Sequence, residues 1–234
     1  MGEKKSLGVP FPHSLARAAA TIGKGVAALA MAAALAGCQT PPPRHLVGPL
    51  PPIPSYSLKR DGIAIRRVAI LPLHYDTGIG RYLNELDAVF NAELNKTALF
   101  EIVKISREDM TEIFGFDQVS SVERIPADLL VRLQERYGVD AVMFTDITHY
   151  RPYQPIAIGV RAKLVEVQQG TILWAFDYVF DSGNPKIAED AKRYYITNSR
   201  KEQHVGFEAR GVLQSPARFA KYAASETYRS LVSQ

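Results

Sequence analysis

The feature that most constrains this chain is a run of prolines between residues 39 and 57. The segment reads QTPPPRHLVGPLPPIPSYS and holds seven prolines. Proline lacks a backbone N–H and fixes φ, so the segment is expected to form neither a helix nor a sheet ladder and to favour extended polyproline II. At about 3.1 Å per residue it would span up to roughly 60 Å. We therefore expect residues 38–62 to be a tether and residues 63–234 to be the folded domain.

The chain before this tether has the pattern of an export signal. A basic stretch over residues 1–24 precedes the apolar run GVAALAMAAALAG, residues 25–37. This run is shorter than the roughly 20 residues that a membrane-spanning helix needs. A positive flank, a short apolar core and small residues at its end predict a signal peptide over residues 1–37. An ordinary signal peptide followed by a chance cysteine is the alternative.

The end of this segment, Leu35-Ala36-Gly37-Cys38, resembles the lipobox of bacterial lipoproteins. In that family the cysteine thiol receives a diacylglyceryl group, the chain is cut before it and the new amino group is acylated. Cys38 is the single cysteine of the sequence, and a thiolate is the nucleophile that such an alkylation needs. The resemblance implies lipidation at Cys38. Gln39 stands where an Asp would signal inner-membrane retention, which implies an outer-membrane anchor with the domain in the periplasm.

The charge balance gives no indication of nucleic-acid binding. The formal net charge is +4, but four of the 28 basic side chains lie in the first 37 residues, beside Glu3 alone. The remaining chain is therefore close to neutral. Since it also lacks a basic stripe interleaved with aromatic residues, we expect no nucleic-acid partner.

Hydrophobic periodicity predicts a single α/β domain with a mixed sheet of about five strands. Strands are expected at 66–73, 99–105, 139–150, 156–167 and 171–181, and helices at 80–97, 107–115, 126–138 and from 215 onward. Ser106 and Asp109 have the spacing of a capping box, Gly138 ends a helix, and the turn at residues 168–170 predicts a hairpin. A charged stretch, 183–214, is expected to lead to the final helix.

Two apolar patterns predict how the last elements pack. The last strand alternates apolar residues on one face, which helices are expected to cover: Ile172, Trp174, Phe176, Tyr178 and Phe180. The final helix is expected to turn an apolar stripe toward the sheet: Phe219, Tyr222, Ala223 and Leu231.

Over residues 66–181 the chain resembles a group of envelope lipoproteins. These are the curli secretion channel family (CsgG), the penicillin-binding-protein activator lipoproteins (LpoB) and the related N-terminal domain of TolB. The resemblance lies chiefly in YGVDAVM, residues 137–143, and LVEVQQGTILW, residues 164–174. The chain departs from the family's D-x-x-T-G-like turn, since its threonine, Thr171, follows Gly170. The resemblance implies a non-enzymatic protein without a cofactor.

Length separates the members of this group. The channel members insert membrane-spanning hairpins after the third strand and after the fifth. Only residues 151–155 lie between the strands expected at 139–150 and 156–167, and the 183–214 stretch is charged throughout, whereas a spanning strand needs about 9–11 alternating residues. A compact domain that binds a protein partner is therefore favoured over a pore.

Few residues offer catalytic or ligand-binding chemistry. The loop at 74–81 contains Gly78-Ile79-Gly80 but lacks the third glycine of a dinucleotide fingerprint, so we interpret it as a turn, although the helix that follows could bind an anion. His74 with Asp76, and His149 with Asp146, are the His–carboxylate neighbours. Residues 146 and 149 are expected on opposite faces of a strand. We expect neither a metal site nor an enzyme.

The segment HYRPYQP, residues 149–155, is the candidate for partner binding. Tyr150, Arg151 and Tyr153 belong to residue types that dominate protein interfaces. Packing of the tyrosines on the sheet is the alternative.

These observations predict a lipid-anchored outer-membrane protein that acts as a protein-binding module, such as an activator or adaptor of an envelope enzyme or assembly. The expected partners are the membrane, through the lipid on Cys38, and a periplasmic or envelope protein. A homo-oligomer is possible, and an oligomeric secretion component of the curli-channel type is the alternative function.

Overall fold

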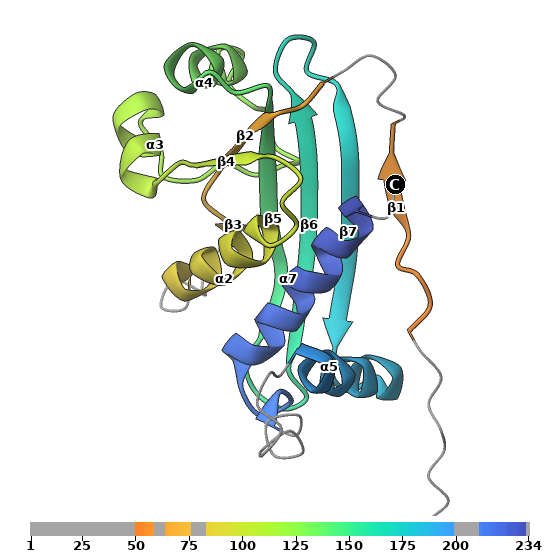
Figure 1. Ribbon diagram of the computed structural model, residues 1–234. Coiled ribbons are helices and arrows are strands. Elements are labelled where there is room, and N and C mark those ends of the chain that lie inside the picture. The colour runs from red at the N-terminus through yellow and green to blue at the C-terminus, as the bar shows by residue number, and fades with distance from the viewer. Residues whose placement is uncertain (1–49, 59–63, 76–82, 199–210, 233–234) are drawn as a thin grey trace, which may run out of the picture. The chain divides into compact units, whose positions relative to one another are not determined.

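The computed structural model describes residues 50–58, 64–75, 83–198 and 211–232 (Figure 1). The expected signal peptide at 1–37, the lipidation site Cys38 and the first part of the tether lie outside these residues, as does Asp76 with the rest of the 76–81 loop. No helix within the described part of the chain has the length and apolar character needed to cross a membrane.

One mixed sheet of seven strands organises the domain, which confirms the predicted α/β fold with a mixed sheet. The strands are β1 (Ser55–Ser57), β2 (Arg67–Ile70), β3 (His74–Tyr75), β4 (Glu101–Lys104), β5 (Ala141–Arg151), β6 (Ala157–Glu166) and β7 (Ile172–Asp181). Their order is β1-β7-β6-β5-β2-β4, and β3 pairs with β5. β2 runs parallel to β4 and β5, whereas β5, β6 and β7 are antiparallel. The two shortest strands, β1 and β3, were not predicted.

Helices lie on both faces of this sheet (Figure 1). They are α2 (Leu83–Asn95), α3 (Arg107–Phe114), α4 (Leu129–Tyr137), α5 (Pro185–Asn198) and α7 (Pro216–Val232). The sequence predicted all of them except α5, which forms in the stretch expected to be a charged connection. Ile187 and Ala191 of α5 are buried, so one apolar side holds this charged helix on the sheet.

The first face of the sheet is covered along its length by α2, α5 and α7. Trp174, Phe176 and Phe180 of β7 are buried there against α7, as the alternation in the sequence predicts. The predicted apolar stripe of the final helix is buried in the same core: Phe219, Tyr222, Ala223 and Leu231. We call this side the first face.

The second face has a smaller core under α3 and α4. Met110 of α3 and Leu133 of α4 pack on Ala69 of β2 and on Val142 and Phe144 of β5. β6 adds a single residue of its strand to this core, and β7 and β1 add none. Among the described helices, none therefore covers β6, β7 and β1 on this side.

Local hydrogen bonds explain where the predicted helices begin and end. The Ser106 hydroxyl accepts from the Asp109 N–H, and the Asp109 carboxylate accepts from the Ser106 N–H, so the capping box at the start of α3 is confirmed. Gly138 ends α4 with φ 62°, a left-handed conformation that glycine adopts without steric cost. α4 begins at Leu129 and not at Pro126 as expected.

A register shift corrects the prediction for Ile172. Leu164 pairs with Trp174, but Val165 pairs with Ile172, so Leu173 is an extra residue in β7. The extra residue reverses the alternation. Ile172 therefore lies on the second face beside Val165 and is 38% exposed, in contrast to the expected place under the helices.

The last residues of the expected tether are part of the sheet. Ser55–Ser57 form β1 and pair antiparallel with Trp174–Phe176 of β7. This corrects the expectation that residues 39–57 form no ladder. The three residues follow Pro54, the last proline of the run, so their backbone N–H groups are free to pair at the edge of a sheet.

A buried carboxylate lies where α5 packs on α7. Burial raises the pKa of Glu226 to about 7, Arg229 opposes this shift, and Asp190 adds to it. The Arg229 guanidinium contacts Glu226 at 2.6 Å, and the Tyr222 hydroxyl donates to Asp190 at 3.0 Å. In the unfolded chain Glu226 regains its ordinary pKa of 4.5.

We predict that this group makes the domain less stable as pH rises. Between pH 4.5 and about 7 the folded state binds more protons at Glu226 than the unfolded state does, so the free energy of unfolding falls across this window, by about 3 kcal/mol at most. Glu226→Gln should remove this slope, and the exposed Glu135→Gln should keep it. Thermal unfolding of the three proteins from pH 4 to 8 measures the slope, and an unchanged slope in Glu226→Gln would contradict the assignment.

Candidate surface on the uncovered half of the sheet

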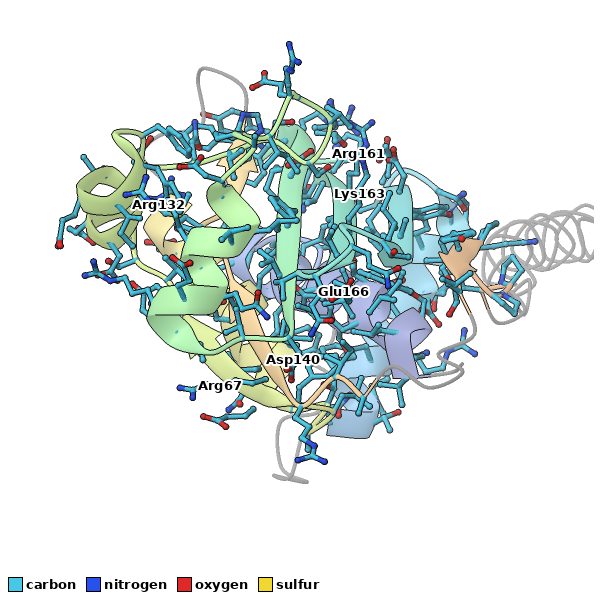
Figure 2. All side chains as sticks on the ribbon, turned by 90° about the horizontal axis from the view of Figure 1, so that it is seen from above. Arg67, Arg132, Asp140, Arg161, Lys163 and Glu166 are labelled. Carbon is cyan, nitrogen blue, oxygen red and sulfur yellow. The ribbon has the colours of Figure 1, made fainter. Side chains whose placement is uncertain are left out.

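The part of the second face that α3 and α4 leave uncovered is the candidate functional surface. The registers of β5, β6, β7 and β1 place seven side chains on this side: Tyr56, Arg161, Lys163, Ile172, Ala175, Asp177 and Val179. We call this set the open half. Figure 2 shows Arg161 and Lys163 next to each other on β6, with Arg132 on α4 to one side.

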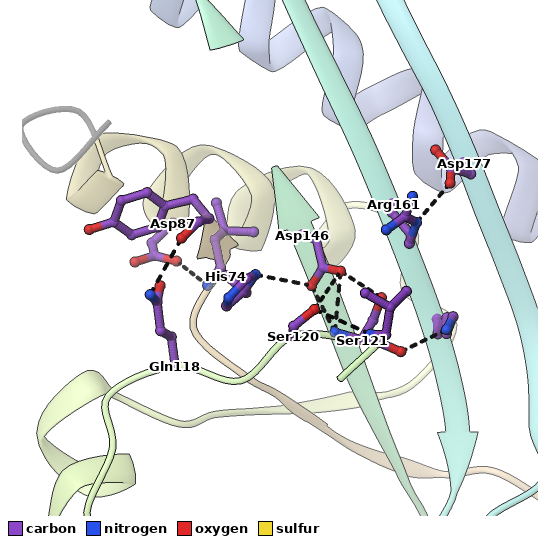
Figure 3. Close-up of polar contacts among 12 residues, drawn as sticks. His74, Asp87, Gln118, Ser120, Ser121, Asp146, Arg161 and Asp177 are labelled. Atoms are coloured by element: carbon purple, nitrogen blue, oxygen red, sulfur yellow. Dashed lines mark hydrogen bonds and ion pairs between the residues drawn. The ribbon is translucent and has the colours of Figure 1, made fainter. Parts of the chain in front are cut away.

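A buried carboxylate borders the open half. The Asp146 side chain on β5 accepts hydrogen bonds from the Ser121 N–H at 2.9 Å and the Ser121 hydroxyl at 2.7 Å, while the Ser120 hydroxyl lies at 3.4 Å. Nδ1 of His74 on β3 lies 3.8 Å from its other side (Figure 3). Asp146 is only 3% exposed. It therefore fixes the connection between α3 and α4 to the centre of the sheet.

In the structure, the histidine that contacts Asp146 is distant from it in the sequence. His74 and Asp146 lie opposite each other in the β3–β5 register, so the histidine beside Asp146 is the one from β3. His149 is exposed at a bulge in β5, where the backbone of Gly159 approaches so closely that a Cβ would lie 2.4 Å from the Thr148 hydroxyl. Asp76 lies outside the described residues.

The order of these contacts does not match nucleophilic catalysis. In a Ser-His-Asp triad the imidazole lies between the hydroxyl and the carboxylate, so that it removes the proton of the nucleophile. Here the carboxylate of Asp146 lies between Ser121 and His74. The hydroxyl donates to an acceptor that orients it, and the contacts hold a loop in place. Within the described ranges, no group of three or more His, Cys, Asp or Glu side chains is placed to hold a metal ion.

Two cationic side chains of β6 lie beside the contacts of Asp146. Lys163 donates to the Ser121 carbonyl at 2.6 Å. Figure 3 shows the contact of Arg161 with Asp177 of β7, to which Arg161 donates at 2.7 Å. The Lys163 contact ties the connection between α3 and α4 to β6. The Arg161–Asp177 pair is partly solvated and adds little stability.

A cavity of about 310 Å³ lies between the connection, the start of α4 and β6. Lys163 is the charged residue of its lining, which is otherwise mostly apolar: Ser121, Ile125, Pro126, Ala127, Leu130, Phe144, Val165, Gly170 and Ile172. The register shift that turns Ile172 to the second face thus places it in this lining.

Apolar side chains are exposed along the rest of the open half. Tyr56 of β1 is 53% exposed and Val179 of β7 is 47% exposed. Together with Ile172 they place exposed apolar side chains on both sides of Asp177 along this face. Apolar surface with a polar rim is the composition of protein-binding surfaces. The alternation in β7 could have identified Val179, but the exposure of Ile172 depends on a bulge with no clear sequence signal.

A second polar site lies at the carboxyl ends of β2 and β4. Arg107 of α3 donates to Asp87 of α2 at 2.9 Å and to the Leu73 carbonyl at 2.9 Å, and Asp87 accepts from the Leu73 N–H at 2.7 Å. A neighbouring cavity of about 220 Å³ is lined by both charges and by Lys104 and Glu108. Because Arg107 and Asp87 satisfy each other and the chain after β2, their role is to hold helices on opposite faces together.

The three residues expected to bind a partner have different environments. Tyr153 is 77% exposed in the turn between β5 and β6. Tyr150 is half-buried against the first-face core. Arg151 donates to Asp181 at 2.8 Å. Burial alone would raise the pKa of Asp181, but the Gly183 N–H and the Arg151 guanidinium lower it below its ordinary value. The side chain of Arg151 thus joins β5 to β7, and Tyr153 extends into solvent.

We predict that Asp146 stabilises the connection between α3 and α4. Asp146→Asn removes one acceptor oxygen and places a buried N–H₂ group against the N–H of Ser121. The free energy of unfolding should therefore fall by about 1–3 kcal/mol. Asp177→Asn, which breaks only the exposed pair with Arg161, should cost less than about 1 kcal/mol. Denaturant unfolding measures both, and hydrogen exchange at Ser121 locates the effect. Equal losses in the two variants would contradict this role of Asp146.

Comparisons with known proteins give no family for this chain. No protein-family model matches the sequence, and no curated protein matches it. Among solved structures, the chain is similar to the PelC dodecamer from Paraburkholderia phytofirmans, with 12% identity over 74% of this chain and 95% of that one and a TM-score of 0.38. It is similar to lipoprotein GNA1162 from Neisseria meningitidis, with 20% identity over 58% of this chain and 99% of that one and a TM-score of 0.39.

The C-terminal domain of LpoB from Salmonella enterica is also similar, with 17% identity over 51% of this chain and 85% of that one and a TM-score of 0.37. LpoB is one of the proteins that the sequence resembles. Identities and TM-scores this low assign neither a family nor a function to the chain.

Proposed function

We propose that this protein is a cell-envelope lipoprotein anchored in the outer membrane, and that its domain is a non-enzymatic protein-binding module. It would act as an activator or adaptor of an envelope enzyme or assembly. The observation that carries the proposal is the open half: the core under α3 and α4 takes a single residue from β6 and none from β7 or β1, and Tyr56, Ile172 and Val179 are exposed.

The anchor and the tether support this proposal from the sequence. The lipobox-like end at Cys38 provides for several acyl chains, which hold a protein stably where one chain would not. The proline-rich segment after it favours extended chain. The domain would therefore reach an envelope partner at a distance from the membrane, with β1 as the point at which the tether joins the sheet.

The polar groups beside the open half favour binding over catalysis. The Asp146 carboxylate lies between its serines and His74, and Lys163 and Arg161 are held by Ser121 and Asp177. Their donors and acceptors maintain the shape of the surface. The curli-channel alternative is disfavoured because α5 occupies residues 185–198, where a spanning hairpin would be needed, and because only a short turn joins β5 to β6.

We predict that Cys38→Ala removes the protein from the outer-membrane fraction, since no thiol remains to be lipidated. The variant should keep the folded domain, because the sheet begins only at Ser55. Fractionation of cells and circular dichroism of the purified protein measure the two properties. Gln39→Asp is the matched control, which should keep the lipid and move the protein to the inner membrane. A Cys38→Ala protein still found in the outer membrane would refute the lipid anchor.

We also predict that the open half holds the partner. The full-length lipoprotein, extracted in detergent, should carry a second envelope protein in native mass spectrometry. Ile172→Asp should lower the bound fraction at least about tenfold, as the loss of a buried apolar contact does. Val131→Asp on α4, a similarly exposed position outside the open half, should leave it unchanged. Equal binding by both variants would place the partner elsewhere, with the Tyr153 turn as the next surface to test.

A further inference from the structure

β7 is covered along only part of its outer edge. The strand spans Ile172–Asp181, but β1 pairs only with Trp174–Phe176. In the described part of the chain, no strand pairs with residues 177–181 on that side. Among the described strands, this part of the edge of β7 therefore has no pairing partner.

The backbone groups that face outward at this edge follow from the hydrogen-bond pattern. Alternate residues of an antiparallel strand bond to opposite neighbours. The Ser182 N–H donates to Ile156 on the β6 side, and the Leu173 carbonyl accepts from Leu58 on the β1 side. Asp177 and Val179 alternate in step with Leu173, so their N–H and C=O groups point outward. These groups have the spacing that pairs with one further strand.

Residues 52–54 of the tether are unable to pair with these groups. Continuing the register of β1, in which Ser55 faces Phe176, places residue 54 opposite Asp177 and residue 52 opposite Val179. Both positions hold proline, which has no N–H to donate. The intervening residue, Ile53, packs against the first-face core. The prolines therefore stop β1 at Ser55 and leave the edge of β7 available.

We propose that residues 177–181 of β7 accept an extended, proline-free segment of an envelope partner protein as an additional strand. This rests on the proposed function and names how the partner binds. Main-chain hydrogen bonds to Asp177 and Val179 would supply the contact, as in other cases of strand addition. Val179, which is exposed beside this edge on the open half, pairs best with an apolar residue, and Asp177 with a basic one.

A second copy of this chain fits the edge less well. Two β7 edges paired antiparallel over residues 177–181 would place Asp177 of each copy opposite Asp181 of the other. Like charges directly opposite each other destabilise a strand pair. A register shifted toward the start of the strand would bring β7 of one copy onto residues 174–176 of the other, which β1 already covers, and a register shifted toward its end would pair only residues 179–181.

The experiment uses the tether to close the edge. In the full-length lipoprotein, Pro52→Thr with Pro54→Thr returns both donors, so β1 should extend along β7, and the amides of Asp177 and Val179 should exchange more slowly. The same variant should carry about tenfold less partner in native mass spectrometry. Pro51→Thr is the matched control, since its N–H would point away from β7 and should change neither measurement.

A second pair of variants tests the edge if β1 does not extend. The Val179 N–H points away from β6, so Val179→Pro removes the outward donor without breaking a bond to β6. Val179→Thr keeps the donor and changes only the side chain. Stronger loss of partner in Val179→Pro than in Val179→Thr supports strand addition.

The outcomes separate the two proposals. If the partner stays bound to a variant whose β1 has extended, or if both Val179 variants bind alike, the strand-addition proposal is wrong. Loss of partner in Ile172→Asp alongside such a result would leave the proposed function standing. If the mass spectrum contains only copies of this chain, or no second protein for any variant, both proposals fail.

Discussion

The buried carboxylate of Asp146 is the interaction on which the second face depends. It accepts hydrogen bonds from the N–H and the hydroxyl of Ser121 on one side, and the imidazole of His74 lies on its other side. The connection between α3 and α4 crosses β5 at this point, and its Ser121 carbonyl accepts a hydrogen bond from Lys163. Because an unpaired buried carboxylate is costly, these partners stay together. The connection therefore reaches as far as β6, where the cavity and the open half lie.

The two faces of the sheet differ because the two kinds of strand pairing differ. Parallel strands need crossovers, and the crossover helices of β2, β4 and β5 lie on both faces. β5, β6 and β7 are joined by tight turns and bring no helix with them. The later helices α5 and α7 both cover the first face. Consequently no described helix covers the second face beyond β5, and apolar side chains such as Val179 are exposed there.

Local signals predicted much of this fold, and long-range pairing accounts for what they missed. The capping box at Ser106 and the helix end at Gly138 depend on neighbouring residues, so the sequence contains the whole interaction. β1 and β3 are too short to show a periodicity, and each exists only because a distant strand pairs with it. The contact of His74 with Asp146 follows from that pairing. The neighbours of His74 and Asp146 in the sequence gave no indication of this contact.

The prolines of the tether act on the sheet as well as on the chain's reach. A tether only needs to be extended, and many compositions would provide that. In this chain, prolines stand opposite Asp177 and Val179, where a longer β1 would donate hydrogen bonds. They therefore also keep the tether from pairing with β7. Proteins commonly protect such edges with proline or charge on the edge strand itself. Here the prolines lie on the neighbouring segment, and the edge strand keeps its N–H and C=O groups. The arrangement ends β1 after three residues, so none of the described strands takes the place at residues 177–181 of β7 that we propose for a strand of another protein.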